Sequence, residues 1–157
     1  MQVIDNFLSE NDFLKIKKTI IHSSFPLYYS EYVNDNDKLN YYFLHTFYDG
    51  FVPMSSYMDL LSPIIKKLEA KALLRAKVNC FPRTEKLIIY KPHRDYNFKH
   101  DGAILYLNNC DGGTYVKDRF IQSKENRVLL FDSSQQHSST NCTDKNCRFN
   151  ININFFK

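Results

Sequence analysis

Residues 147–156 read Cys-Arg-Phe-Asn-Ile-Asn-Ile-Asn-Phe-Phe, and apolar side chains alternate strictly with polar ones from Arg148 to Phe155. Because successive side chains of a β-strand point to opposite faces, this period of two predicts a strand with one apolar and one polar face. The apolar face carries Phe149, Ile151, Ile153 and Phe155, and the polar face carries Arg148, Asn150, Asn152 and Asn154. The polar face is expected either to lie in solvent or to line the interior of a rolled sheet.

Further runs rich in β-branched and aromatic residues precede this stretch, and turn signals separate them. The predicted strands cover residues 76–81, 86–91, 103–108, 114–117 and 127–132. The breaks include Asp111-Gly112-Gly113 and Glu125-Asn126, where Gly and Asn are expected to supply the positive φ of tight turns. Short strands at this spacing predict a closed or double-sheet β architecture such as a jelly roll.

The first half of the chain has helical periodicity instead. Ser9 is expected to cap a helix that ends near residue 22, and a second helix is predicted over residues 54–73. Residues 28–51 are aromatic-rich and broken by turns, which indicates short strands and a loop. We therefore expect a mainly β fold with N-terminal helices. Residues 1–75 would form helical support with flanking strands and residues 76–157 the β-roll, within one domain.

Length and composition exclude several classes of protein. The 157 residues suit one domain, and 43% hydrophobic with 15% aromatic residues is too apolar for a disordered chain. The net charge of +4 is spread along the chain, so nucleic acid is not an expected partner. No apolar run approaches the roughly 18 residues of a membrane span, and the N-terminus lacks signal-peptide features. We expect a soluble, cytoplasmic protein that is a monomer or weak homodimer.

The cysteines form no CxxC motif. Without a secretory signal, Cys80, Cys110, Cys142 and Cys147 are expected to be free thiols. Cys142 and Cys147 are spaced like half of a zinc site, but no second pair accompanies them, so structural zinc is not expected.

The segment Ile89-Tyr-Lys-Pro-His93-Arg-Asp95 carries the chemistry. On a strand, His93 and Asp95 point to the same face, and His137 could reach them from a later strand. Two imidazoles and one carboxylate with an open face suit a non-haem Fe(II) site. Alternatively, His93 caps a strand end and Asp95 begins a polar loop. The His-Arg-Asp triplet also opens the protein-kinase catalytic loop, but no Asp-Phe-Gly follows it here.

Arg148 lies eleven residues after His137, and on an adjacent antiparallel strand it could sit deeper in the same roll. A buried guanidinium requires an anionic partner, yet its own strand contains no Asp or Glu. The carboxylate of a bound small molecule could supply that partner through a bidentate pair.

An ordered set of motifs runs through the second half of the chain. The set is His93-x-Asp95, Ala103-Ile-Leu-Tyr106-Leu-Asn108, Asp111-Gly-Gly-Thr, Asn126-Arg-Val-Leu-Leu-Phe131, His137 and Arg148. It resembles the 2-oxoglutarate/Fe(II)-dependent dioxygenases, specifically the prolyl 4-hydroxylase-like branch in its short single-domain viral and bacterial form. The resemblance covers about residues 76–156, and residues 1–75 resemble the helical support of that family only loosely.

The resemblance implies a double-stranded β-helix in which His93, Asp95 and His137 hold Fe(II). The 2-oxoglutarate co-substrate would chelate the metal, and its distal carboxylate would pair with Arg148 and accept a hydrogen bond from Tyr106. O2 would be the second co-substrate.

Further roles follow from the same resemblance. Asn79 is similar to an Asn that lies near the 1-carboxylate of 2-oxoglutarate in several relatives, although Phe81 stands where those relatives often carry Tyr. If the polar face of the last strand lines the roll, Asn152 approaches the co-substrate and Asn154 approaches the metal or the prime substrate. The side chains expected to contact the prime substrate are Tyr90, Tyr96 and Asn154.

The implied activity is hydroxylation with decarboxylation of 2-oxoglutarate to succinate and CO2, and the favoured substrate is a peptidyl-prolyl or other protein side chain. Nucleobase demethylation is a weaker alternative, because that branch usually carries a second Arg where Asn154 stands. Two alternatives of other classes stay open: a non-catalytic β-roll binding module, and a metal-dependent isomerase or hydrolase on a cupin-like roll.

Overall fold

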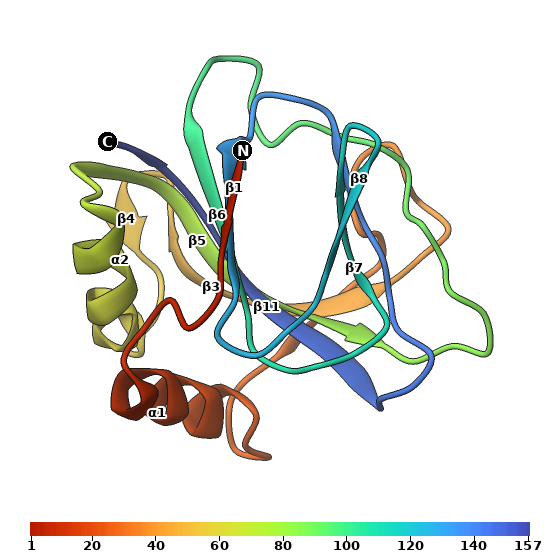
Figure 1. The fold of residues 1–157 in the computed structure, drawn as a ribbon, viewed down its shortest axis with the longest axis horizontal. Coiled ribbons are helices and arrows are strands. Elements are labelled where there is room, and N and C mark those ends of the chain that lie inside the picture. Colours follow the sequence, from red (N-terminus) through yellow and green to blue (C-terminus); the bar gives the residue numbers. More distant parts are fainter.

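Two antiparallel sheets face each other across the interior of the protein, and the helices lie outside the larger one (Figure 1). The computed structural model describes residues 1–157. The large sheet has the strand order β1-β9-β6-β11-β5-β3-β2, with β4 paired to β3, and the small sheet has the order β10-β7-β8. The elements are β1 (Gln2–Ile4), α1 (Glu10–Ile20), β2 (Tyr28–Ser30), β3 (Tyr42–Asp49), β4 (Val52–Pro53), the 3-10 helix η1 (Met58–Leu61), α2 (Ser62–Leu68), β5 (Ala72–Pro82), β6 (Asp101–Tyr106), β7 (Gly113–Val116), β8 (Arg119–Gln122), β9 (Val128–Asp132), β10 (His137–Ser139) and β11 (Cys147–Phe156).

Strand β11 lies at the centre of the large sheet, between β5 and β6. The predicted alternation is confirmed: Ile151, Ile153 and Phe155 belong to the core cluster shared with the helices. The polar face is also buried, since Asn150 is 3% and Asn154 0% exposed. It therefore lines the interior of the roll and does not face solvent.

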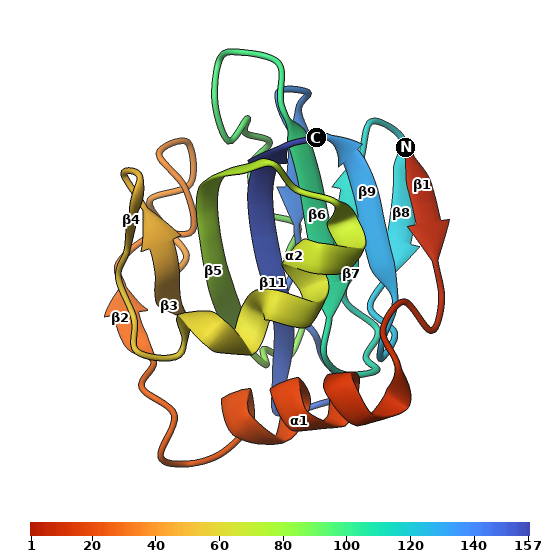
Figure 2. The same cartoon turned by 90° about the vertical axis from the view of Figure 1, so that its left-hand side faces the viewer.

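Helix α1 begins where the sequence predicts, because the Ser9 hydroxyl accepts a hydrogen bond from the Asp12 amide at 3.2 Å. Its buried residues Phe13, Ile16 and Ile20 join the core cluster against the large sheet. Figure 2 shows α1 and α2 on the same face of that sheet. Neither helix is long and apolar enough to span a bilayer.

The predicted helix over residues 54–73 is wrong at both ends. Only η1 and α2 are helical, and α2 ends where Glu69 adopts a left-handed φ of 56°. The chain then enters β5, because the Lys71 amide donates to the Phe156 carbonyl at 2.8 Å. The expected boundary between helical support and β-roll at residue 75 consequently falls inside β5.

The predicted strand over residues 86–91 is also wrong. Its backbone is held by remote side chains: the Ile88 amide donates to Asn141 Oδ1 at 2.7 Å, and the Lys91 amide donates to Asp37 Oδ2 at 3.0 Å. Ile89 makes only an isolated bridge to Thr140. The segment still lies beside β10, because the Tyr90 amide donates to the Ser139 carbonyl at 3.0 Å.

The predicted strands over residues 76–81, 103–108, 114–117 and 127–132 correspond to β5, β6, β7 and β9, with shifted ends, while β1, β4, β8 and β10 were not predicted. Asn126 has the expected positive φ of 56°. Gly112 and Gly113 do not have positive φ. Gly112 is required for close approach instead, since a Cβ there would lie 1.9 Å from the Asn141 carbonyl oxygen.

Candidate metal centre

Backbone pairing between two distant segments brings His93 and His137 together. The amide of each donates to the carbonyl of the other at 3.0 Å, and the imidazole centroids are 4.4 Å apart. Directly paired residues of antiparallel segments point to the same side, so both imidazoles face the interior of the roll. Asp95, two residues after His93, joins them.

One ligand atom from each of His93, Asp95 and His137 lies within 4.8 Å of the other two. His93 Nε2 is 3.7 Å from Asp95 Oδ1, and His137 Nε2 is 3.9 Å from Asp95 Oδ2. His137 Nδ1 lies 3.0 Å from the Gln135 carbonyl oxygen, so the proton is assigned to Nδ1 and the Nε2 lone pair points at the site.

Asp95 is held by neighbours that favour its ionised form. Burial raises the pKa of its carboxyl group, but the charge of Arg75, joined by the two imidazoles when they are protonated, outweighs burial and holds the pKa well below its usual range. Arg75 Nη2 lies 2.7 Å from Oδ1, while the Ser133 hydroxyl donates to Oδ2 at 2.6 Å and Asn154 Nδ2 donates to it at 2.8 Å. The carboxylate is therefore preorganised to bind a cation.

His93 is neutral at physiological pH. Burial, reinforced by the neighbouring His137, lowers the pKa of His93 to about 4. A neutral imidazole presents a lone pair to a metal, whereas an imidazolium does not. Two imidazoles and a buried carboxylate are a donor set that fits Fe(II).

A polar cleft of about 370 Å³ opens over this group. Only one of its eleven lining residues is hydrophobic. They are Val33, Asn34, Asp35, Asn36, Arg75, Lys77, His93, Arg94, Asp95, Asn97 and Gln136. Amide and charged side chains thus surround the open side of the candidate centre.

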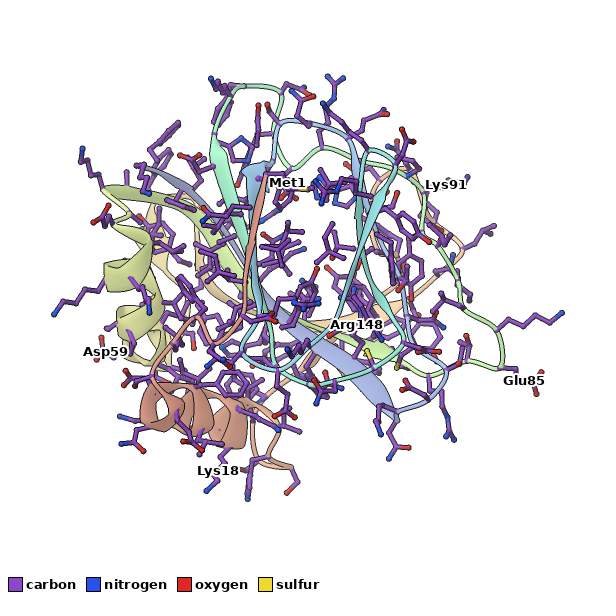
Figure 3. All side chains as sticks on the ribbon, viewed as in Figure 1. Met1, Lys18, Asp59, Glu85, Lys91 and Arg148 are labelled. Atoms are coloured by element: carbon purple, nitrogen blue, oxygen red, sulfur yellow. The ribbon has the colours of Figure 1, made fainter.

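Arg148 lies between the two sheets, as Figure 3 shows, and is 0% exposed. Its Nε donates to the Thr140 carbonyl at 2.8 Å, its Nη2 donates to the Ser139 hydroxyl, and its guanidinium lies 4.6 Å from the Phe81 ring centroid. Nη1 is buried without a partner, and no carboxylate forms an ion pair with Arg148. The orphaned donor fits a bound carboxylate.

Asparagine side chains of β5 and β11 line the interior beside the imidazoles. Asn79 Nδ2 donates to Asn150 Oδ1 at 2.9 Å, and Asn152 Nδ2 lies 3.5 Å from Asp95 Oδ2. A small cavity of about 30 Å³ touches these asparagines and both imidazoles. It holds about two water molecules, so a larger ligand enters only when lining side chains move.

The three tyrosines predicted to contact co-substrate or substrate lie in different surroundings. Tyr106 is 0% exposed, and its hydroxyl lies 3.4 Å from the Ile121 carbonyl. Tyr96 packs on Arg75, whose guanidinium lies 5.5 Å from the ring centroid, at the edge of the cleft. Tyr90 does not line the cleft: it is 3% exposed and its ring lies 5.5 Å from that of Phe81, because the irregular segment turns it inward.

Three residues of the centre were not predicted. Arg75 and Ser133 bind Asp95. His100 is 3% exposed, and its Nε2 lies 3.2 Å from Asn154 Nδ2. The alternation of residues 75, 77, 79 and 81 could have placed Arg75 on the inner face. No local pattern indicates Ser133 or His100.

No family model matches the sequence, and a search of curated proteins finds no match. Solved structures nevertheless share the fold. A viral collagen prolyl hydroxylase from Paramecium bursaria Chlorella virus-1 is 16% identical, with a TM-score of 0.63, covering 99% of this chain and 96% of that one. A prolyl hydroxylase from Trichoplax adhaerens, in complex with a hypoxia inducible factor peptide fragment, is 16% identical, with a TM-score of 0.67, covering 99% and 82%.

A 2OG-Fe(II) oxygenase family oxidoreductase from Burkholderia pseudomallei is 10% identical, with a TM-score of 0.70, covering 98% of this chain and 84% of that one. At these identities the likeness establishes the fold. The chain has the jelly-roll fold of the 2-oxoglutarate and Fe(II) oxygenases, and the predicted fold class is confirmed.

Proposed function

We propose that the protein is an Fe(II)- and 2-oxoglutarate-dependent dioxygenase that hydroxylates a side chain of a peptide or protein, with prolyl as the favoured target. One observation carries the proposal: His93, Asp95 and His137 converge in the roll that also buries Arg148 without an anionic partner. A non-catalytic β-roll would have no need of either feature.

In this proposal His93, Asp95 and His137 hold Fe(II). With 2-oxoglutarate bound, the metal supplies O2-dependent hydroxylation, and 2-oxoglutarate is decarboxylated to succinate and CO2. Arg148 Nη1 is free to pair with the distal carboxylate of 2-oxoglutarate. Arg75 keeps the metal-binding carboxylate ionised and oriented.

The cofactor roles of the neighbouring side chains belong to the same proposal. Tyr106 would turn its hydroxyl from the long contact with Ile121 to the distal carboxylate. Asn79 and Asn152 have buried Oδ1 atoms without partners, so their amide groups can reorient when a polar ligand enters. Asn154 stays with Asp95 and orients it.

The cleft supports a peptide substrate. Asn34 and Asn36 already donate to the Lys91 and Pro92 carbonyls. Asn97 and Gln136 present amide donors and acceptors along the wall of the cleft, which suits the hydrogen-bonding groups of an extended main chain. The Trichoplax prolyl hydroxylase with the same fold was solved with a peptide fragment bound.

The test is turnover. Protein loaded anaerobically with Fe(II) and 2-oxoglutarate is exposed to O2 together with proline-containing peptides, succinate is quantified, and the peptides are weighed for the gain of one oxygen atom. We expect His137→Ala to abolish succinate formation. The matched control is His22→Ala, which removes an exposed imidazole outside the site and should leave turnover unchanged.

Equal succinate formation by His137→Ala and the unaltered protein would contradict the proposed centre. Succinate formation without any oxidised peptide would keep the reaction class and remove the peptide substrate.

A further inference from the structure

A second cluster of metal-binding side chains lies outside the candidate iron centre. Cys110 follows β6, whereas Cys142 and Asp144 lie in the loop between β10 and β11. The two Sγ atoms and one carboxylate oxygen all lie within 4.8 Å of one another. Cys110 is 3% and Cys142 0% exposed, while Asp144 closes the cluster from the surface. All four cysteines of the chain are free thiols, as the sequence predicts.

The two segments that carry these ligands are already fixed to each other. The Asp111 amide donates to Asp144 Oδ1 at 3.0 Å, and the Thr143 amide donates to Asp111 Oδ1 at 2.8 Å. The absence of a side chain at Gly112 lets the segments touch, since a Cβ there would lie 1.9 Å from the Asn141 carbonyl oxygen. Hydrogen bonds between backbone amides and side-chain carboxylates therefore preorganise the ligand set.

The charge of the surroundings suits an anionic metal complex. Two thiolates and one carboxylate carry three negative charges, so a divalent cation leaves one. Arg148 lies against the same turn, because a Cβ on Gly112 would lie 3.0 Å from Arg148 Cδ. A complex with one negative charge would be attracted to this buried guanidinium, which forms no ion pair within the chain.

We propose that Cys110, Cys142 and Asp144 bind a divalent thiophilic cation, with Zn²⁺ as the expected metal. Zn²⁺ takes thiolate and carboxylate ligands in tetrahedral geometry, and water completes the fourth position. Binding forms two metal–sulfur bonds and one metal–oxygen bond and releases the two thiol protons to solvent. The bound metal cross-links the turn after β6 to the loop that leads into Arg148.

The pairing differs from the one that sequence spacing indicates. Cys142 and Cys147 are spaced like half of a zinc site, but Cys147 lies on β11 opposite Pro82 and outside the cluster. A disulfide between Cys110 and Cys142 is the competing use of these thiols. The carboxylate of Asp144 at the third corner favours a metal, because a disulfide has no use for it.

The test uses Co²⁺ as a spectroscopic substitute for Zn²⁺. Metal-free, reduced protein is titrated anaerobically with Co²⁺, and thiolate-to-cobalt charge transfer is followed in the near-ultraviolet. In His93→Ala, which lacks one ligand of the candidate iron centre, we expect this band to saturate at one equivalent and to disappear when one equivalent of Zn²⁺ is added. The candidate iron centre contains no sulfur ligand, so His93→Ala should retain the band.

Cys142→Ser should abolish the band, and the matched control Cys147→Ser should keep it. If Cys142→Ser does not fold, the exposed Asp144→Asn replaces it and should weaken Co²⁺ binding at least about tenfold. Absence of the band in the unaltered protein, or its persistence in folded Cys142→Ser, would overturn the proposal. So would a Cys110–Cys142 disulfide that forms equally fast with and without Zn²⁺, because that result assigns the pair a redox role.

Discussion

Replacing Arg148 with methionine should separate co-substrate binding from folding. Arg148 is 0% exposed and gives hydrogen bonds to the Thr140 carbonyl and the Ser139 hydroxyl, but no carboxylate lies against it. A buried charge without a counter-charge lowers stability, and an apolar side chain of similar length is often tolerated in its place. Arg148 is therefore expected to serve binding more than stability.

The magnitudes follow from these contacts. The methionine variant loses two hydrogen bonds, worth about 1 kcal/mol each, which lowers stability. It also no longer pays the several kcal/mol that burying a charge costs, which raises stability. We expect its free energy of unfolding to stay within about 2 kcal/mol of the unaltered protein or to rise. A charge-assisted pair with the distal carboxylate is worth about 1.5–3 kcal/mol, which corresponds to roughly 10- to 150-fold weaker 2-oxoglutarate binding.

Two measurements check the prediction. Urea denaturation gives the free energy of unfolding, and anaerobic calorimetry of 2-oxoglutarate added to Mn²⁺-loaded protein gives the affinity. Arg119→Met, which changes an exposed arginine on β8, is the matched control and should alter neither quantity. Unchanged 2-oxoglutarate affinity in Arg148→Met would place the carboxylate anchor elsewhere. A loss of stability far beyond 2 kcal/mol, with binding retained, would show that Arg148 is structural.

Three further substitutions test other contacts. Arg75→Met should raise the pKa of Asp95 and weaken Fe²⁺ binding about tenfold or more, most strongly at acid pH. Anaerobic titrations at pH 6 and pH 8 measure this, and an affinity equal to that of the unaltered protein at both pH values would refute it. Gly112→Ala should lower the free energy of unfolding, measured by urea denaturation, by about 1–3 kcal/mol or more, since a Cβ there would lie 1.9 Å from a carbonyl oxygen. Unchanged stability would show that the backbone of the turn can shift to make room for the methyl group. The hydrogen-bonded Arg127 lowers the pKa of Asp5, so this carboxylate stabilises the fold above its unfolded pKa and less as pH falls. Asp5→Asn should cost up to about 1 kcal/mol at pH 7, and the difference in urea midpoint should shrink below about pH 4; a difference independent of pH would contradict it.

The last strand shows what a local pattern can predict. Its alternation predicted both faces of β11, because side-chain direction along a strand depends only on the period of two. Whether the polar face met solvent or the interior depended on the small sheet, which closes the roll over it. The missing carboxylate partner of Arg148 was the clue that favoured the interior.

Tertiary contacts explain why the predicted helix over residues 54–73 and the predicted strand over residues 86–91 were wrong. The apolar spacing of residues 54–73 is helical, yet pairing of Lys71 with Phe156 draws the end of that segment into β5. Residues 86–91 have strand composition, but the Ile88 and Lys91 amides donate to side chains of Asn141 and Asp37, and only Tyr90 donates to the β10 backbone. Neither effect has a signal within the segment itself.

The metal-binding residues could be predicted where their spacing along one segment determines the direction of their side chains. His93 and Asp95 are two residues apart, and the structure places both beside His137. Arg75 binds Asp95 from twenty residues away, and Cys110 meets Cys142 across two loops. Such pairs depend on topology, which the spacing of residues in the sequence does not encode.

The central claim is that His93, Asp95 and His137 bind Fe(II) in a roll where Arg148 receives 2-oxoglutarate. Anaerobic titration of the protein with Fe(II) and 2-oxoglutarate tests it most directly, because chelation of Fe(II) by a 2-keto acid produces a visible metal-to-ligand charge-transfer band. We predict a band that saturates at one equivalent of each and is lost in Asp95→Ala. No band in the unaltered protein, or an equal band in that variant, would contradict the claim.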